Sequence, residues 1–175
     1  MAKLLKIIVT ALVLVIISLA GLFVYLGGFM PVMVEERTLG PYLMAYREIP
    51  VVKFSEVGEI TTALNRDLRD LGLTDFHPFD LFYPDQRAEI GFIITSGDEA
   101  KVQQASSPIK LRVIPAQSYL TANFPWKTSL SYLVGYMKVD MALTKYRDEH
   151  GFRKTWAATE HLGDSIRYLQ PIEKE

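Results

Sequence analysis

The sequence predicts an α+β domain built from two βαββ halves and preceded by one transmembrane helix. Three observations lead to this fold class. An uncharged apolar run covers residues 7–26, two later segments have helical apolar periodicity, and the order strand, helix, strand, strand occurs twice at a spacing of about 70 residues. We therefore expect two halves related by a pseudo-twofold axis, with antiparallel sheets and two long helices.

The apolar run at 7–26 is expected to cross the lipid bilayer. Only Thr10, Ser18 and Gly21 lie outside the strongly apolar set. Twenty helical residues at about 1.5 Å each match a hydrocarbon core of about 30 Å. A cleaved signal peptide is the alternative, because Ser18 to Ala20 resemble a small-x-small cleavage site. The run continues unbroken through Tyr25, which favours a retained span.

The charges on either side of the run predict its orientation. Lys3 and Lys6 lie in the short basic N-terminus, residues 1–6, whereas Glu35, Glu36 and a single Arg37 follow the run. By the positive-inside rule the N-terminus stays in the cytoplasm. The soluble domain is then on the exported side, periplasmic or extracellular.

Residues 27–40 are predicted to be a linker, since glycines begin it and Gly40-Pro41 ends it. The soluble domain is expected over 41–173. Its first half begins with a strand at 42–48. A helix follows, with Ser55 as N-cap and Gly72 after its last apolar position. A hairpin formed by 79–83 and 89–95 completes this half.

The second half repeats this order. A strand at 109–114 alternates apolar and basic residues, and 115–124 is expected to continue it irregularly. A helix should run from about Ser129 to His150-Gly151, with one apolar stripe consisting of Leu130, Leu133, Val134, Met137 and Met141. Strands at 155–160 and 165–169 follow.

The composition excludes several function classes. From residue 35 onward the chain carries 17 basic and 20 acidic residues, a net charge of −3, so nucleic acid is not an expected partner. The absence of cysteine rules out disulfides and thiolate chemistry. No phosphate-binding glycine loop or catalytic signature occurs. The three histidines lie in separate elements, so neither a metal site nor a cofactor is expected.

Aromatic residues and one acid are the candidate site. The aromatic candidates are placed where they could line one cavity, although core packing is the more common role of any single ring: Tyr83, Trp126, Tyr132, Tyr136 and Trp156. Strand alternation puts Glu160 on the same face as Trp156. If that face looks outward, Glu160 is a solvated acid; if it faces a cavity, an organic cation is a natural partner.

Several short motifs resemble the GyrI-like small-molecule-binding family, which includes effector-binding domains of AraC-type and MerR-type multidrug regulators. The motifs are Pro41-Tyr42, Phe82-Tyr83-Pro84-Asp85, Ile114-Pro115-Ala116-Gln117-Ser118-Tyr119, Glu149-His150-Gly151-Phe152, Thr159-Glu160 and Leu169-Gln170-Pro171-Ile172. The resemblance covers about residues 40–173. It implies a duplicated strand-helix-strand-strand fold with a cleft that takes hydrophobic, often cationic compounds. It also implies that Glu160 is the cavity acid and that Phe82 and Tyr83 are aromatic walls.

The expected function is a membrane-tethered, non-catalytic binding module for amphipathic or cationic small molecules. Regulators of this family carry a helix-turn-helix region where this chain has its apolar run, so DNA-binding regulation is not expected. Membrane-anchored relatives include an animal receptor for autophagy of the endoplasmic reticulum, which makes a protein-interaction or adaptor domain the first alternative. A hydrolase that opens strained electrophilic compounds is the second.

Overall fold

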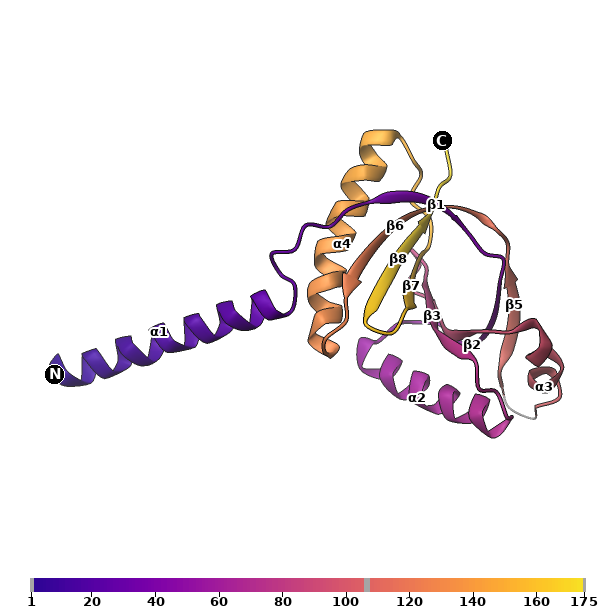
Figure 1. The fold of residues 1–175 in the computed structure, drawn as a ribbon, viewed down its shortest axis with the longest axis horizontal. Helices are drawn as coiled ribbons and strands as arrows, with labels where there is room; N and C mark the ends of the chain where they lie inside the picture. Colours follow the sequence, from indigo (N-terminus) through magenta and orange to yellow (C-terminus); the bar gives the residue numbers. More distant parts are fainter. Residues whose placement is uncertain (1, 106–107, 175) are drawn as a thin grey trace.

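The computed structural model describes residues 2–105 and 108–174, and it confirms the predicted α+β fold behind an N-terminal apolar helix (Figure 1). The elements are α1 (Ala2–Tyr25), β1 (Glu35–Leu39), β2 (Tyr42–Ile49), α2 (Phe54–Asp70), β3 (Phe76–Phe82), β4 (Ala88–Ile94), a 3-10 turn (Ser96–Asp98), α3 (Glu99–Gln103), β5 (Lys110–Ile114), β6 (Gln117–Pro125), α4 (Ser129–His150), β7 (Ala157–His161) and β8 (Ser165–Pro171).

One curled antiparallel sheet contains all eight strands, in the order β1-β6-β8-β7-β3-β4-β2-β5. This order is a palindrome about the β7–β3 pair, since β1 corresponds to β5, β6 to β2 and β8 to β4. Each half is therefore a βαββ unit plus a leading strand, and that leading strand pairs with the other half: β1 with β6, and β5 with β2. The predicted duplication is confirmed, with an exchange of edge strands added to it.

The sheet curls into a half-barrel, and two short links connect its outer strands (Figure 1). Gly40-Pro41 carries the chain from β1 to β2, and Pro115-Ala116 carries it from β5 to β6. The links touch, since a Cβ atom at Gly40 would lie 3.3 Å from the Cα atom of Ala116. Residues 115–124 therefore do not continue β5, as the sequence suggested, but form the second link and a separate strand.

The two long helices cover the convex face of the sheet. Leu64 and Leu68 of α2 pack on β2 and β4, and Val139 and Leu143 of α4 pack on β6 and β8. As predicted, a glycine in the left-handed conformation follows the end of each long helix: Gly72 with φ 78° after α2, and Gly151 with φ 65° after α4. Ser55 is not the N-cap of α2, because the helix already includes it and Lys53 takes the cap position.

Four of the five residues of the apolar stripe predicted on α4 point away from the core, whereas the fifth, Val134, is half-buried against it. Leu133 is 58% exposed, Met137 59% and Met141 65%, and Leu130 is exposed as well. The face of α4 that packs on the sheet consists of Ser131, Gly135, Val139, Leu143 and Arg147. Small residues there allow close contact: a Cβ atom on Gly135 would lie only 2.7 Å from atoms of Phe124 and Tyr168. Periodicity thus located the helix but not the side that faces the core.

Helix α1 projects from the domain (Figure 1), and its side chains are exposed from Lys3 to Tyr25. It is long and apolar enough to cross a membrane, a property shared by transmembrane spans and signal sequences. The segment after it is fixed to the domain, since Leu26, Gly27 and Gly28 are buried and the Lys138 Nζ atom donates to the Gly28 carbonyl at 2.7 Å. Residues 27–40 were expected to be a linker; they instead contain this packed segment and strand β1.

Candidate functional site: a tyrosine-lined cavity

A cavity of about 440 Å³ lies where the two halves meet. Its walls come from the β3–β4 turn on one side and from α4 on the other, with β7 and β8 as the floor. The lining residues are Val52, Phe82, Tyr83, Pro84, Gln86, Arg87, Tyr132, Tyr136, Asp140, Leu143, Lys154, Thr155, Ala157, Ala158, Thr159, Tyr168, Leu169 and Gln170. This volume is within the range of small-molecule sites.

Four of the seven candidate residues named from the sequence line this cavity. Phe82 and Tyr83 come from the end of β3, and Tyr132 and Tyr136 lie one turn apart on α4. Because residues four apart share a helix face, the two α4 rings project toward the same space. The structure brings these four together; whether they bind a ligand stays a prediction.

The cavity tyrosines are neutral hydrogen-bonding phenols at physiological pH. Burial raises the pKa of Tyr83, Tyr132, Tyr136 and Tyr168 above its ordinary value, and desolvation is the largest cause in each case. The Tyr168 hydroxyl donates to the Tyr132 carbonyl at 3.4 Å. These side chains therefore offer apolar ring faces with a polar edge, which suits an amphipathic guest.

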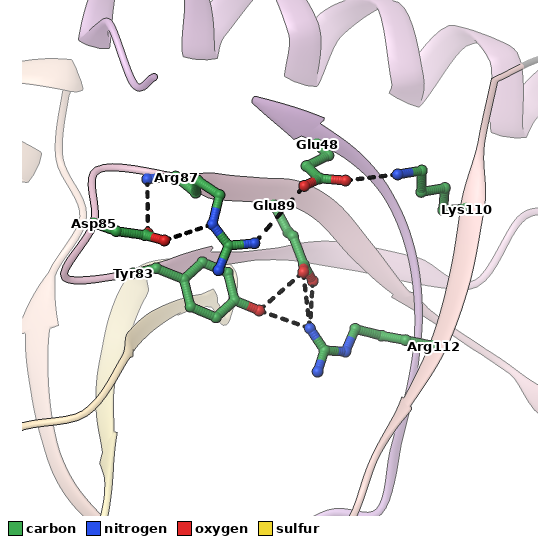
Figure 2. A network of polar contacts seen from close by, with 7 residues as sticks. All are labelled: Glu48, Tyr83, Asp85, Arg87, Glu89, Lys110 and Arg112. Atoms are coloured by element: carbon green, nitrogen blue, oxygen red, sulfur yellow. Dashed lines mark hydrogen bonds and ion pairs between the residues drawn. The ribbon is translucent and has the colours of Figure 1, made fainter. Parts of the chain in front are cut away.

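Tyr83 joins the cavity to a network of charged residues shown in Figure 2. Its hydroxyl donates to Glu89 Oε1 at 2.9 Å, and Arg112 Nη1 donates to both Glu89 oxygens and to the same hydroxyl at 2.7–2.8 Å. Glu89 is buried, so this arginine supplies the countercharge that it needs. The network fixes the position of the Tyr83 ring against the cavity.

Arg87 is also held in place. Its guanidinium lies 4.8 Å from the centroid of the Tyr83 ring and 2.7 Å from Asp85, with Glu48 at 3.8 Å, and Figure 2 shows it between those two carboxylates. Asp140 and Lys154 are the other charged residues in the lining. Asp140 is therefore the acid in the cavity lining that a cationic ligand could meet.

A buried acid lies behind the cavity wall. Asp80 of β3 is 5% exposed and pairs in register with the lining residue Thr159 of β7. Its Oδ1 atom accepts from the Gly91 amide at 3.2 Å. Desolvation raises the pKa of Asp80 from 3.8 to about 7, and its field raises the pKa of Tyr132. The acid is thus electrostatically coupled to a cavity tyrosine.

The other three candidates lie outside the cavity lining. Trp126 packs edge-on against His161, with ring centroids 5.2 Å apart, and Trp156 packs against Tyr119 on the concave face. Glu160 is on that concave face as well and is 3% exposed. Its carboxylate accepts from Arg167 Nη1 at 2.9 Å and lies 3.1 Å from His77 Nε2.

Glu160 therefore has partners of its own, and the sequence could not show them. Arg167 faces it only because β7 and β8 pair in that register. Asp80 was missed too, although an acid inside the apolar run Phe79 to Phe82 is a signal that could have identified it. Arg112 carried a weaker signal, as the basic residue in an alternating strand. Among the described residues, no group of three or more histidines and acids could hold a metal ion.

Comparison with known proteins shows the fold. No family model matches the chain, and no curated protein matches it. Among solved structures, the EcmrR C-terminal domain matches 83% of this chain and 100% of its own, with a TM-score of 0.67 at 13% identity. SAV2435 bound to tetraphenylphosphonium matches 81% of this chain and 94% of its own, with a TM-score of 0.59 at 7% identity.

A hydrolase from Listeria innocua also matches, over 80% of this chain and 91% of its own, with a TM-score of 0.51 at 11% identity. At these identities the likeness concerns architecture alone. The eight-stranded antiparallel half-barrel with its two covering helices is consistent with the GyrI-like fold that the sequence motifs predicted.

Proposed function

We propose that this chain is a membrane-tethered, non-catalytic binding module for amphipathic or cationic small molecules, and that the tyrosine-lined cavity is its site. One observation carries the proposal: four tyrosine rings surround a cavity of about 440 Å³ with the acid Asp80 directly behind its wall. Helix α1 is the tether, with the N-terminus in the cytoplasm and the domain on the exported side, as the basic residues before it favour.

The chemistry of the cavity supports a cationic guest. A ring face attracts an organic cation by about 0.5 to 2 kcal/mol, and several rings share the effect. A bound cation would also lower the pKa of Asp80, because a nearby positive charge favours the ionised carboxylate. The carboxylate formed in this way would then balance the charge of the cation. The similar SAV2435 is bound to tetraphenylphosphonium, a lipophilic cation and therefore a guest of this kind.

The experiment titrates the full chain in lipid nanodiscs with tetraphenylphosphonium and with neutral triphenylphosphine oxide. Tyr136→Ala should weaken binding of the cation by about 0.5 to 2 kcal/mol, because one ring face is lost. Ala157→Phe should fill the cavity and weaken the binding of both probes. Asp80→Asn should weaken binding of the cation and leave the affinity for the neutral compound unchanged. Unchanged affinities in all three variants would refute the site.

Glu160 provides the matched comparison, since the resemblance to GyrI-like domains assigns the cavity acid to it. Its carboxylate is paired with Arg167, so Glu160→Gln should change the preference for the cation less than Asp80→Asn does. The reverse order would return the role of cavity acid to Glu160. Turnover of a strained electrophile, lost in a cavity variant, would instead favour the hydrolase alternative, and a stoichiometric protein partner with no ligand binding would favour the adaptor.

A further inference from the structure

We infer that the outer face of α4 lies on the lipid bilayer, so that the domain rests on the membrane surface instead of hanging from it. The docking surface consists of Leu130, Leu133, Met137 and Met141, which are all more than half exposed. This inference rests on the proposed membrane tether, and it adds a second, interfacial contact to it.

The surface is a continuous apolar stripe on one side of the helix. Its four residues are three or four apart, so they lie one above another along about 16 Å of helix. The buried residues Gly135, Val139 and Leu143 occupy the opposite side. A helix with one apolar face on a sheet and a second exposed to water is uncommon in a soluble domain, and such patches mark binding surfaces.

The position of α1 identifies the bilayer as the occupant. Lys138 of α4 donates to the carbonyls of Gly28 and Met30, three and five residues after α1 ends. If α1 spans the membrane, these carbonyls lie at the bilayer surface, and the lysine holds α4 at the same depth. Figure 1 shows α4 on the side of the domain from which α1 leaves, with its axis running across that of α1.

The exposed residues around this junction extend the same surface. Phe29 is 74% exposed and Met33 73%, and both lie in the segment between α1 and β1. Exposed Lys127 precedes α4, where its ammonium can reach lipid phosphates. The C-terminal turn of α4 carries Asp148 and Glu149, which disfavour insertion. The contact is therefore confined to the part of α4 from Leu130 to Met141, which lies in the plane of the bilayer interface.

The chain contains no cysteine, so a single introduced cysteine can be labelled at one chosen position. Single cysteines at Leu133 and Met137 of the stripe are spin-labelled in the full chain, in phosphatidylcholine nanodiscs holding one copy. Glu149→Cys at the far end of α4 and Thr62→Cys on exposed α2 are the water-facing controls. Ile16→Cys reports on the span. The measurement compares collision with apolar oxygen and with a water-soluble nickel chelate.

The stripe labels should be shielded from nickel severalfold relative to the labels at Glu149 and Thr62, and should collide preferentially with oxygen. Equal nickel access at all four positions, with Ile16 in hydrocarbon, overturns the inference and leaves the tether intact. A water-accessible Ile16 overturns the tether as well. Shielding that needs two copies per disc and comes with spin–spin broadening overturns the inference in favour of a second copy of this chain.

Discussion

Helices α2 and α4 occupy corresponding places in the two halves, yet their outer faces are opposites. Both cover the convex face of the sheet with buried aliphatic residues. The exposed side of α2 is polar, with Glu59, Thr62 and Arg66, whereas that of α4 is apolar. The duplicated fold thus requires apolar residues on the side of each helix that packs on the sheet. The residues on the outer side are free to differ between the two helices.

The two buried glutamate–arginine pairs on the concave face of the sheet also differ from each other. Each half contributes one buried glutamate: Glu160 of β7 pairs with Arg167 of β8 in its own half, and Glu89 of β4 pairs with Arg112 of β5, the strand that the other half lends. The arginine side chain is 19% exposed in the first pair and 40% exposed in the second. The glutamate–arginine pair within the second half is therefore deeply buried, whereas the pair that joins β4 to the exchanged strand β5 is partly solvated.

The largest expected effect comes from breaking the deeper pair. Arg167→Met leaves the Glu160 carboxylate buried beside His77 alone, and should lower the free energy of unfolding by about 3 to 5 kcal/mol. Arg112→Met should cost less, about 1 to 3 kcal/mol, because the Tyr83 hydroxyl still donates to Glu89. Urea unfolding in detergent micelles measures both. Equal losses would show that the halves do not differ in this respect, and Glu160→Gln should recover much of the loss in Arg167→Met.

The second effect depends on pH and arises from β3. Since the pKa of Asp80 rises from 3.8 to about 7 on folding, the folded state holds a proton that the unfolded state releases. Its favourable contribution is full below about pH 3.8 and is lost as the pH rises to about 7. Asp80→Asn should therefore be more stable than the parent protein above pH 7, by about 2 to 4 kcal/mol.

Measuring unfolding from pH 4 to 8 tests this. The difference between the parent and Asp80→Asn should grow across that interval and then level off. A constant difference would mean that the carboxylate does not change its protonation on folding.

Third, replacing a glycine with alanine should lower the stability of the protein in α4 and raise it in α2. A Cβ atom on Gly135 meets Phe124 and Tyr168 at 2.7 Å, so Gly135→Ala should cost about 1 to 3 kcal/mol through overpacking. A Cβ atom on Gly58 of α2 would point into open space, and Gly58→Ala should gain up to about 1 kcal/mol from helix propensity. Thermal unfolding of the two variants decides; a gain at Gly135 would contradict the close packing of α4.

The smallest effect concerns the outer faces themselves. In detergent micelles Leu133→Gln and Glu59→Gln should each change the free energy of unfolding by less than about 0.5 kcal/mol, since both residues are exposed. Repeating the measurement in lipid nanodiscs sharpens the comparison, because only Leu133→Gln should then become destabilising. Equal behaviour of the two variants in lipid would remove the distinction between the helices.

The parts of this fold that sequence could predict are those with local signals. Gly72 and Gly151 mark the ends of the long helices, and the aromatic content of the predicted helix made Tyr132 and Tyr136 cavity candidates. Strand β1 has no alternating pattern and is defined only by its pairing with β6. The arginine that neutralises Glu160 depends on the register of two strands, and the face of α4 that packs on the sheet depends on Gly135 and Ser131. These are tertiary properties, which a periodicity cannot contain.

The palindromic strand order has a consequence for how this molecule can be divided. Because each half lends its leading strand to the other, cutting the chain between β4 and β5 would leave two fragments that each lack an edge strand and expose unpaired backbone donors and acceptors. Neither fragment is an independent domain. A single half could complete the same eight-stranded sheet only by pairing with its own twin, so the modern chain has the layout of a symmetric dimer whose two subunits were joined end to end.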